Sequence, residues 1–480
     1  MSKAQETCAH EALQLEPSAH AEEVGYKRPD ADQRSAALTK SGRKPPPAYL
    51  DDMPLRRKTR LAHSEEQSWN EDQNIPQAFP APLVLPNDEL AWDPKYSPQS
   101  FRSWNNIKER NKPNKELTWS HTRRKTLYVA AVPEITPSMV FMEEWLEPRV
   151  GKEAISSTPE KLASPPLEDL IKYISAFYHG MPVKYLPGLQ FKPWKGPKKP
   201  SSNPNIVPKY VGLGEGTSCT RIRARSSPDC VFKGQLNLSD LLDAAIYLLP
   251  EDAYSILLLI NHDMYEDEAD DFCCGRAYGG SRVAVVSTAR YHPALDDHAE
   301  IDYAHMWPAS HCKSYVQNLH AAGLQPERKR ARKSKPVGDR SWPMWAAVDA
   351  VKTIKKPSTA EDRSGLWFSR VARTAVHELG HCFGMDHCVY YACVMQGTAS
   401  IAEDVRQPPY LCPVCLKKIT YFLAVEFELK GKISEREYVM SRYSELATFC
   451  DSWKNVGMFA GYKAWLCARL TKFSKEQEGS

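Results

Sequence analysis

The chain has 480 residues, 42% of them hydrophobic, which is enough for one large domain or two with a substantial core. Its net charge of +4 is too small to indicate a nucleic-acid partner, and no apolar run approaches the roughly 18 residues that span a membrane. The chain starts with polar residues rather than a signal peptide, and its thirteen cysteines are an odd number. These features predict a cytoplasmic or nuclear protein that is not secreted.

Residues 1–120 are predicted to be largely disordered. This Pro-rich region contains Pro45–Pro47, many charges and little hydrophobic periodicity, so it cannot bury enough surface to offset chain entropy. A short apolar island, Phe79–Pro86, interrupts it. The island is either part of a linker or a segment that lies on the catalytic domain or on a partner.

Strands and helices alternate in the region that follows. The expected elements are a strand at Lys125–Val132, a helix at Leu167–Tyr178, a long loop at Leu186–Pro208, a helix capped by Ser239 that runs to Leu249, a strand at Tyr254–Ile260 and a strand at Ser281–Tyr291. Such alternation predicts an α+β architecture with a twisted mixed sheet and a few helices.

A basic run, Arg328–Lys333, lies in a Pro/Gly-flanked insertion at about residues 323–342. The run is a nuclear import signal, a patch for an acidic partner, or a mobile solvated insertion. Its charge does not distinguish among these three interpretations.

The strongest motif is HExxHxxGxxH at residues 377–387. His377 and His381 are four residues apart, so on a helix both imidazoles reach one ion. The apolar residues of the preceding run, Leu366–Val376, recur at helical spacing. Gly384 can end or bend that helix, because glycine adopts left-handed conformations at little cost, and the turned chain can bring His387 back as a third ligand.

Three protein ligands leave a fourth zinc position for water, whose pKa zinc can lower to about 7. Glu378 neighbours a ligand and is assigned as general base and then as proton donor to the leaving amine. The alternatives are a structural zinc site and helix-face histidines without metal. The motif therefore predicts zinc-assisted hydrolysis of peptide bonds.

Four cysteines follow at once, namely Cys388, Cys393, Cys412 and Cys415. Two close pairs separated by an irregular segment are typical of a four-cysteine structural zinc site. Reduced buried thiols or two disulfides are the alternatives. Met395, within the same loop, either forms a methionine turn beneath the histidines or is an ordinary core residue.

The joined pattern HExxHxxGxxHC-x4-C-x-M…CxxC resembles the archaemetzincin family, a branch of the metzincin zinc metallopeptidases. The resemblance is specific over His377–Cys415 and looser upstream to about Lys125. It implies a zincin-like fold with an active-site helix and two zinc ions, one catalytic and one structural. It also implies aminopeptidase-like cleavage or cleavage of short peptides. The strand at Arg282–Arg290 would then be an edge strand that pairs with substrate, or an ordinary strand.

The predicted organisation is an N-terminal region at 1–120, a metallopeptidase domain at 121–425 and a C-terminal helical extension at 426–480, with a helix at Glu435–Trp453. A peptide is the expected substrate, and the sequence does not predict the oligomeric state. The competing function is a non-catalytic zinc-containing module that binds peptides or proteins.

Overall fold

A computed structural model describes residues 8, 10–44, 77–86, 88, 96–107, 124–149, 162–194, 206–323, 340–426 and 433–478. The basic run Arg328–Lys333 lies outside these residues. The chain divides into two compact units. Unit 1 comprises Met1–Ile107, Asp302–Lys356 and Met385–Ser480, and unit 2 comprises Lys108–Ile301 and Pro357–Gly384.

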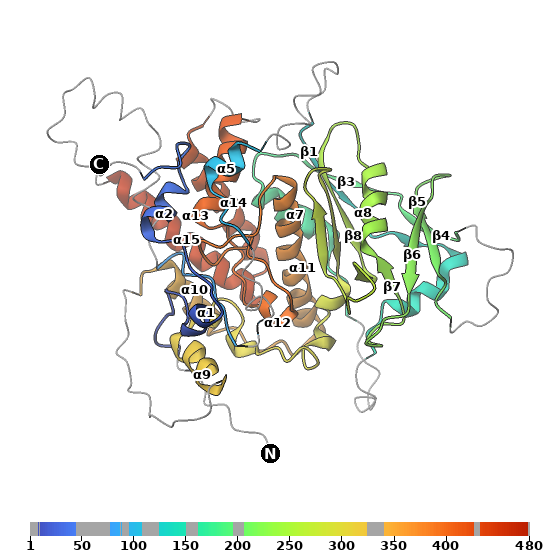
Figure 1. Cartoon of the computed structure of the whole chain (residues 1–480), viewed down its shortest axis with the longest axis horizontal. Helices are drawn as coiled ribbons and strands as arrows, with labels where there is room; N and C mark the ends of the chain where they lie inside the picture. The colour runs from blue at the N-terminus through green and yellow to red at the C-terminus, as the bar shows by residue number, and fades with distance from the viewer. Residues whose placement is uncertain are drawn as a thin grey trace. The chain divides into compact units, whose positions relative to one another are not determined.

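Unit 2 contains a five-stranded sheet in the order β10-β11-β8-β1-β3. Strands β1, β3 and β8 of this sheet are labelled in Figure 1. Its strands are β1 (Thr126–Ala130), β3 (Val183–Leu186), β8 (Ala253–Ile260), β10 (Gly275–Tyr278) and β11 (Val283–Ser287). Neighbouring strands are parallel, except that β10 pairs antiparallel with β11. The sheet is therefore mixed, as the sequence predicts.

The interpretation of Arg282–Arg290 as an edge strand is wrong. The corresponding strand, β11, is flanked by β8 on one side and β10 on the other. The chain reverses between β10 and β11, and Arg282 at this reversal has a φ of 60°. The hairpin therefore places β10 at the edge of the sheet, where its outer backbone groups face no neighbouring strand of that sheet.

Helices cover both faces of this sheet, which explains why every residue of β8 is buried. Helix α8 (Leu238–Tyr247) packs against β11 and shares a core cluster with Ile256, Leu258 and Ile260. Successive strand residues point to opposite faces of the sheet. The β8 residues that lie between these three therefore point toward the other face, which α11 (Ala360–Cys382) covers. A third helix, α7 (Leu167–Phe177), packs against α11.

A second sheet in unit 2 has the order β2-β4-β5-β6-β7-β9. Its strands are β2 (Glu134–Ile135), β4 (Gln190–Lys192), β5 (Tyr210–Gly214), β6 (Thr220–Arg225), β7 (Gln235–Asn237) and β9 (Asp263–Tyr265). The shared core cluster takes residues from both sheets, from α8 and from the 3₁₀ helix η4 (Pro137–Trp145). Two further 3₁₀ turns are η6 (Ala289–Tyr291) and η7 (Pro293–Leu295).

Three expected elements of unit 2 differ in detail from the structure. The strand expected at Ser281–Tyr291 is shorter, because β11 ends at Ser287 and Ala289–Tyr291 forms η6. Helix α8 begins at Leu238 because the side chain of Asn237 accepts a hydrogen bond from the Asp240 amide. Ser239, the predicted cap, therefore lies inside the helix. The expected loop at Leu186–Pro208 contains the short strand β4.

Unit 1 is mainly helical. Its helices are α1 (Ala19–Glu23), α2 (Ala31–Ala36), α5 (Phe101–Asn105), η8 (Tyr303–His305), η9 (Ala309–His311), α9 (Lys313–Gly323), α10 (Pro343–Val351), α12 (Ile401–Asp404), α13 (Pro413–Thr420), the π-helix η10 (Tyr421–Glu426), α14 (Glu435–Ser452) and α15 (Gly457–Glu478). Helix α15 packs against α10 and α14 (Figure 1). The helix expected at Glu435–Trp453 corresponds to α14.

Three of these helices, α1, α2 and α5, lie within residues 1–120, for which composition predicts little order. The apolar island Phe79–Pro86 belongs to the core of unit 1. Phe79 is fully buried, and its ring contacts the rings of Tyr391, Tyr410 and Trp465. Apolar contacts with distant residues thus supply the burial that the local sequence lacks. None of the helices in the described residues has the length and apolar character needed to cross a bilayer.

Candidate metal centres

Helix α11 carries the first half of the histidine motif. It begins at a capping box, in which Thr359 and Asp362 each accept a backbone hydrogen bond from the other residue. It ends at the C-cap residue Phe383, and Gly384 follows with a φ of 74°. The helix therefore ends where the glycine spacing predicts.

Contacts within unit 2 hold α11 along its length. The Trp367 indole donates to the Thr288 carbonyl at 2.8 Å, and the Tyr178 hydroxyl donates to the Val376 carbonyl at 2.6 Å. At the end of the helix, Arg282 donates to the carbonyl of Cys382 at 2.9 Å. These bonds limit movement of the helix turn that carries the histidines.

A buried ion pair adds a further anchor for α11. Arg370 donates two hydrogen bonds to the Asp296 carboxylate, at 2.6 and 2.8 Å. Both side chains are almost fully buried, so removal of one partner leaves an uncompensated charge in the interior. The pair therefore constrains the rotation of α11 about its axis.

His377 and His381 lie one turn apart on α11. Their Nε2 atoms are 3.1 Å apart and their rings are inclined at 78°. Two nitrogens on one tetrahedral zinc lie about 3.3 Å apart, because each Zn–N bond is about 2.0 Å long. The two imidazoles therefore fit adjacent positions around a zinc ion.

Glu378 is 6% exposed and lies close to the edge strand β10. A Cβ atom added at Gly275 would lie 3.1 Å from both Cγ and Oε1 of Glu378. A Cβ at Gly279, in the β10–β11 turn, would lie 2.7 Å from the carbonyl oxygen of His381. The two glycines thus allow the backbone of this hairpin to approach the end of α11. Sequence reasoning missed their role, because nothing local connects residue 275 with residue 378.

Replacement of Gly384 by alanine should destabilise the protein by about 1–2 kcal/mol, because an L side chain strains a left-handed backbone. Thermal unfolding of Gly384→Ala measures this effect. Gly280→Ala is the matched control, because a Cβ there meets no atom within 4 Å and its φ is outside the positive range. Equal melting temperatures for the two variants would contradict the prediction.

His387, the predicted third ligand, belongs to unit 1. The Tyr96 ring meets the His387 ring edge-on, with centroids 4.5 Å apart. The Gln99 side chain donates to the Asp386 carboxylate at 2.8 Å and accepts from the Asp386 amide at 3.1 Å. Tyr96 and Gln99 therefore position the segment around His387. Sequence analysis missed both, since they lie almost 300 residues upstream.

A cavity of about 290 Å³ lies in unit 1 beside His387. Its lining includes Tyr96, whose ring meets the His387 ring, and Gly397, where an added Cβ would lie 3.1 Å from Nδ1 of His387. Other lining residues are Tyr26, His311, Gln396 and Arg406. Four segments far apart in the sequence therefore form one cavity next to a predicted zinc ligand.

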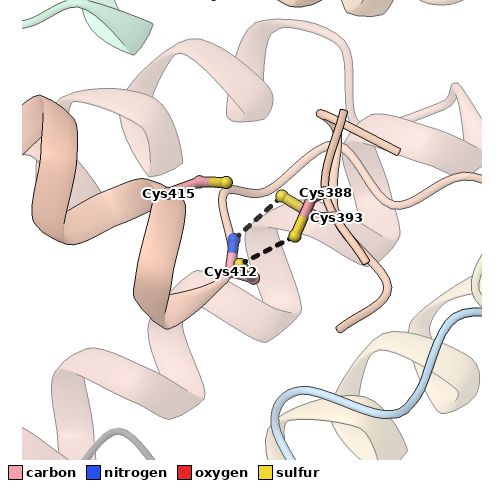
Figure 2. A group of neighbouring side chains, drawn as sticks. All are labelled: Cys388, Cys393, Cys412 and Cys415. Atoms are coloured by element: carbon pink, nitrogen blue, oxygen red, sulfur yellow. Dashed lines mark hydrogen bonds between the residues drawn. The ribbon is translucent and has the colours of Figure 1, made fainter. Parts of the chain in front are cut away.

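The four predicted cysteines lie together in unit 1 (Figure 2). All four are buried free thiols, and their sulfur atoms lie within 4.8 Å of one another. Sγ of Cys388 and Sγ of Cys412 are 3.5 Å apart, whereas two thiolates on tetrahedral zinc lie about 3.8 Å apart, given Zn–S bonds of about 2.3 Å. The cluster fits a zinc ion with four thiolate ligands.

Backbone amides and neighbouring thiols support the cysteine cluster. Sγ of Cys393 accepts a hydrogen bond from the amide of Cys412 at 3.2 Å (Figure 2). It accepts another from the amide of Met395 at 3.5 Å. Hydrogen bonds from Cys393 and the other two thiols hold the pKa of Cys388 well below its usual value. Burial and the neighbouring thiols raise the pKa of Cys393 and of Cys412 well above the usual value. Without a metal the cluster therefore favours a single thiolate at Cys388, and a bound zinc ion would supply the positive charge that stabilises the others.

Met395 links the cysteine cluster to the histidine segment. Its side chain is fully buried, and its carbonyl accepts the amide hydrogen of Cys388 at 2.7 Å. Because Cys388 directly follows His387, the turn at Met395 restrains the backbone of the predicted third ligand.

Comparisons with known proteins match the part of the chain that carries the histidine and cysteine motifs. Residues 346–421 match the sequence model of Peptidase family M54. Archaemetzincin-2 of Homo sapiens is 22% identical over 350 residues, which cover 71% of this chain and 69% of that protein. Archaemetzincin-1 of Homo sapiens is 25% identical over 283 residues, which cover 58% of this chain and 44% of that protein. The crystal structure of archaemetzincin from Methanopyrus kandleri is 17% identical, with a TM-score of 0.29, and the match covers 63% of this chain and 97% of that chain.

Proposed function

We propose that this protein cleaves short peptides in an aminopeptidase-like manner at the end of α11. The basis is that the chain belongs to the archaemetzincin family and is a zinc metallopeptidase. The proposal assigns catalytic zinc to His377, His381 and His387 and makes Glu378 the general base. The observation that carries it is the 3.1 Å separation of the His377 and His381 Nε2 atoms on the turn that also bears Glu378.

Zinc bound by the three histidines would supply a water of lowered pKa and a Lewis acid for the scissile carbonyl. Glu378 would act as the general base that accepts a proton from the attacking water and as the donor of that proton to the leaving amine. Its burial against Gly275 keeps the carboxylate in one place and shields it from bulk water. Such a fixed carboxylate needs little reorganisation during the reaction.

We assign substrate alignment to the edge strand β10. An extended peptide can add to this edge by backbone hydrogen bonds, which do not depend on side-chain identity. Gly275, at the start of β10, lies against Glu378. A peptide bound along β10 therefore has its backbone held beside the general base.

We assign the cavity of unit 1, which lies beside the proposed ligand His387, to a substrate side chain. Its lining includes Tyr96 and Gly397, which both lie against the ring of His387. A volume of about 290 Å³ suits one or two side chains rather than a folded domain. This limit on size supports short peptides as substrates.

A second, structural zinc on Cys388, Cys393, Cys412 and Cys415 completes the proposed set of two ions. The four-cysteine cluster supports its presence.

We place the protein in the cytoplasm or nucleus, because thirteen free thiols suit a reducing compartment. A module that only binds peptides has no use for the buried base Glu378, so the catalytic function is favoured.

Metal content tests the histidine site. His381→Ala should contain one zinc ion fewer than the wild type by plasma mass spectrometry, because removal of one of three protein ligands greatly weakens binding. Hydrolysis of a short-peptide library should fall with it. His298→Ala, at an exposed position of unit 2, is the control. An unchanged zinc content in His381→Ala would overturn the assignment of the ligands.

A further inference from the structure

A second group of metal-ligating side chains lies in unit 1, outside the two centres described above. An N-terminal segment pairs with the chain after η9: Leu13 and Cys312 form an antiparallel bridge. The amide of Gln14 donates to the carbonyl of His311 at 2.6 Å, and the amide of Lys313 donates to the carbonyl of Ala12 at 2.8 Å. This pairing brings Cys8 and His10 to residues about 300 positions later in the sequence.

The cluster contains two thiols and two imidazoles. Ligand atoms of Cys8, His10 and His305 lie within 4.8 Å of one another. Sγ of Cys312 lies 3.0 Å from Nδ1 of His10. The Cys8 thiol lies 2.7 Å from the Ser314 hydroxyl and also interacts with the Cys312 thiol. Two cysteines and two histidines are a common ligand set of closed, structural zinc sites.

His305 is oriented as a metal-binding histidine would be. Its Nδ1 lies 2.8 Å from the Asp302 carboxylate, and the Tyr315 ring stacks on the imidazole at a centroid distance of 3.8 Å. Its Nε2 is buried and makes no hydrogen bond of ordinary geometry among the described residues, and the Cys8 thiol lies close enough to interact with the ring. The side chain as a whole is about nine-tenths buried. A carboxylate on one imidazole nitrogen commonly fixes the other nitrogen as a zinc ligand.

We propose that Cys8, His10, His305 and Cys312 bind a further zinc ion, which attaches the N-terminal segment to unit 1. Cys312 and His305 are buried, whereas Cys8 and His10 are partly exposed. The N-terminal segment therefore forms the outer side of the site and closes it. The proposal is independent of catalysis, because it concerns none of the residues assigned to the reaction.

The site has a consequence for the cavity of unit 1. Gly25 and Tyr26, from the same N-terminal segment, and His311, adjacent to Cys312, are part of the cavity lining. A metal ion at this site would therefore attach the start of the segment that supplies part of the lining to Cys312, the neighbour of another lining residue.

Metal analysis of the full-length protein tests the proposal. Cys8→Ser should contain one zinc ion fewer than the wild type, whereas Cys467→Ser, which removes an exposed thiol from α15, should retain the full number. His10→Gln should lose the same ion, and it guards against an effect specific to the serine substitution. Adding His381→Ala to Cys8→Ser should remove one further zinc ion, which separates this site from the catalytic one.

A spectroscopic measurement provides a second readout. Protein reconstituted with Co²⁺ should show weaker thiolate-to-cobalt charge-transfer absorption in Cys8→Ser than in the wild type, while Cys467→Ser matches the wild type. Zinc content and cobalt spectra that do not change in Cys8→Ser and His10→Gln would overturn the proposal. A Cys8–Cys312 disulfide in non-reducing peptide maps, together with an unchanged zinc content, would overturn it as well.

Discussion

Glu378→Gln is expected to lower kcat/KM for peptide hydrolysis by about 10²–10⁴-fold, the usual contribution of a general base. Glutamine keeps the size and the hydrogen-bonding shape of glutamate but cannot accept the proton of the attacking water. Because Glu378 is not among the predicted zinc ligands, the metal content should stay the same. The measurement is hydrolysis of a fluorogenic short-peptide library by wild type and variant at equal zinc loading.

Glu361→Gln is the matched control for this experiment. Glu361 is exposed in the first turn of the same helix, α11, so the same chemical change occurs far from the histidines along the helix. We expect its activity to equal that of the wild type. Full activity of Glu378→Gln on all peptides tested would contradict the role of Glu378 as general base.

Cys412→Ser is expected to remove one zinc ion and to destabilise unit 1. Structural zinc sites contribute about 10–16 kcal/mol to the folding of small zinc domains, so the loss of one thiolate ligand should cost about 4 kcal/mol or more. For a unit of this size, that corresponds to a fall in melting temperature of about 8–16 °C. Cys412 also serves as the N-cap residue of α13, which ties the cluster to a buried helix.

Differential scanning calorimetry together with zinc analysis measures this effect, and Cys467→Ser is the control because its thiol is exposed. Addition of a strong chelator to the wild type should produce a similar fall in melting temperature. If Cys412→Ser keeps both the wild-type zinc content and the wild-type melting temperature, the four cysteines are not a zinc site.

The strand and helix predictions show what local patterns convey. The continuous apolar run at Tyr254–Ile260 predicts a central strand, and β8 is one, because a strand covered on both faces needs apolar residues at every position. The position of β10 at the sheet edge could not be predicted in this way. Its place depends on which strand pairs with β8, and that choice is made by contacts between distant residues.

The N-terminal region is a second example of what local sequence patterns cannot predict. Residues 1–120 lack the periodicity of a self-sufficient fold, yet Phe79 and Trp104 are fully buried. Each needs apolar surface that only other parts of unit 1 supply. Composition therefore could not reveal the surfaces on which the apolar residues of this region pack.

The sequence by itself determined the residue types of two proposed metal centres, the helix that carries His377 and His381, and its end at Gly384. These features depend on spacing over a few residues, because helix periodicity places positions i and i+4 on one face and glycine permits a left-handed turn. Only the tertiary structure decided that Gly275 lies against Glu378, that Tyr96 lies against His387, and that Cys8 and His10 meet His305 and Cys312. Those contacts join residues far apart in the chain, and the packing of whole elements, rather than any local pattern, brings them together.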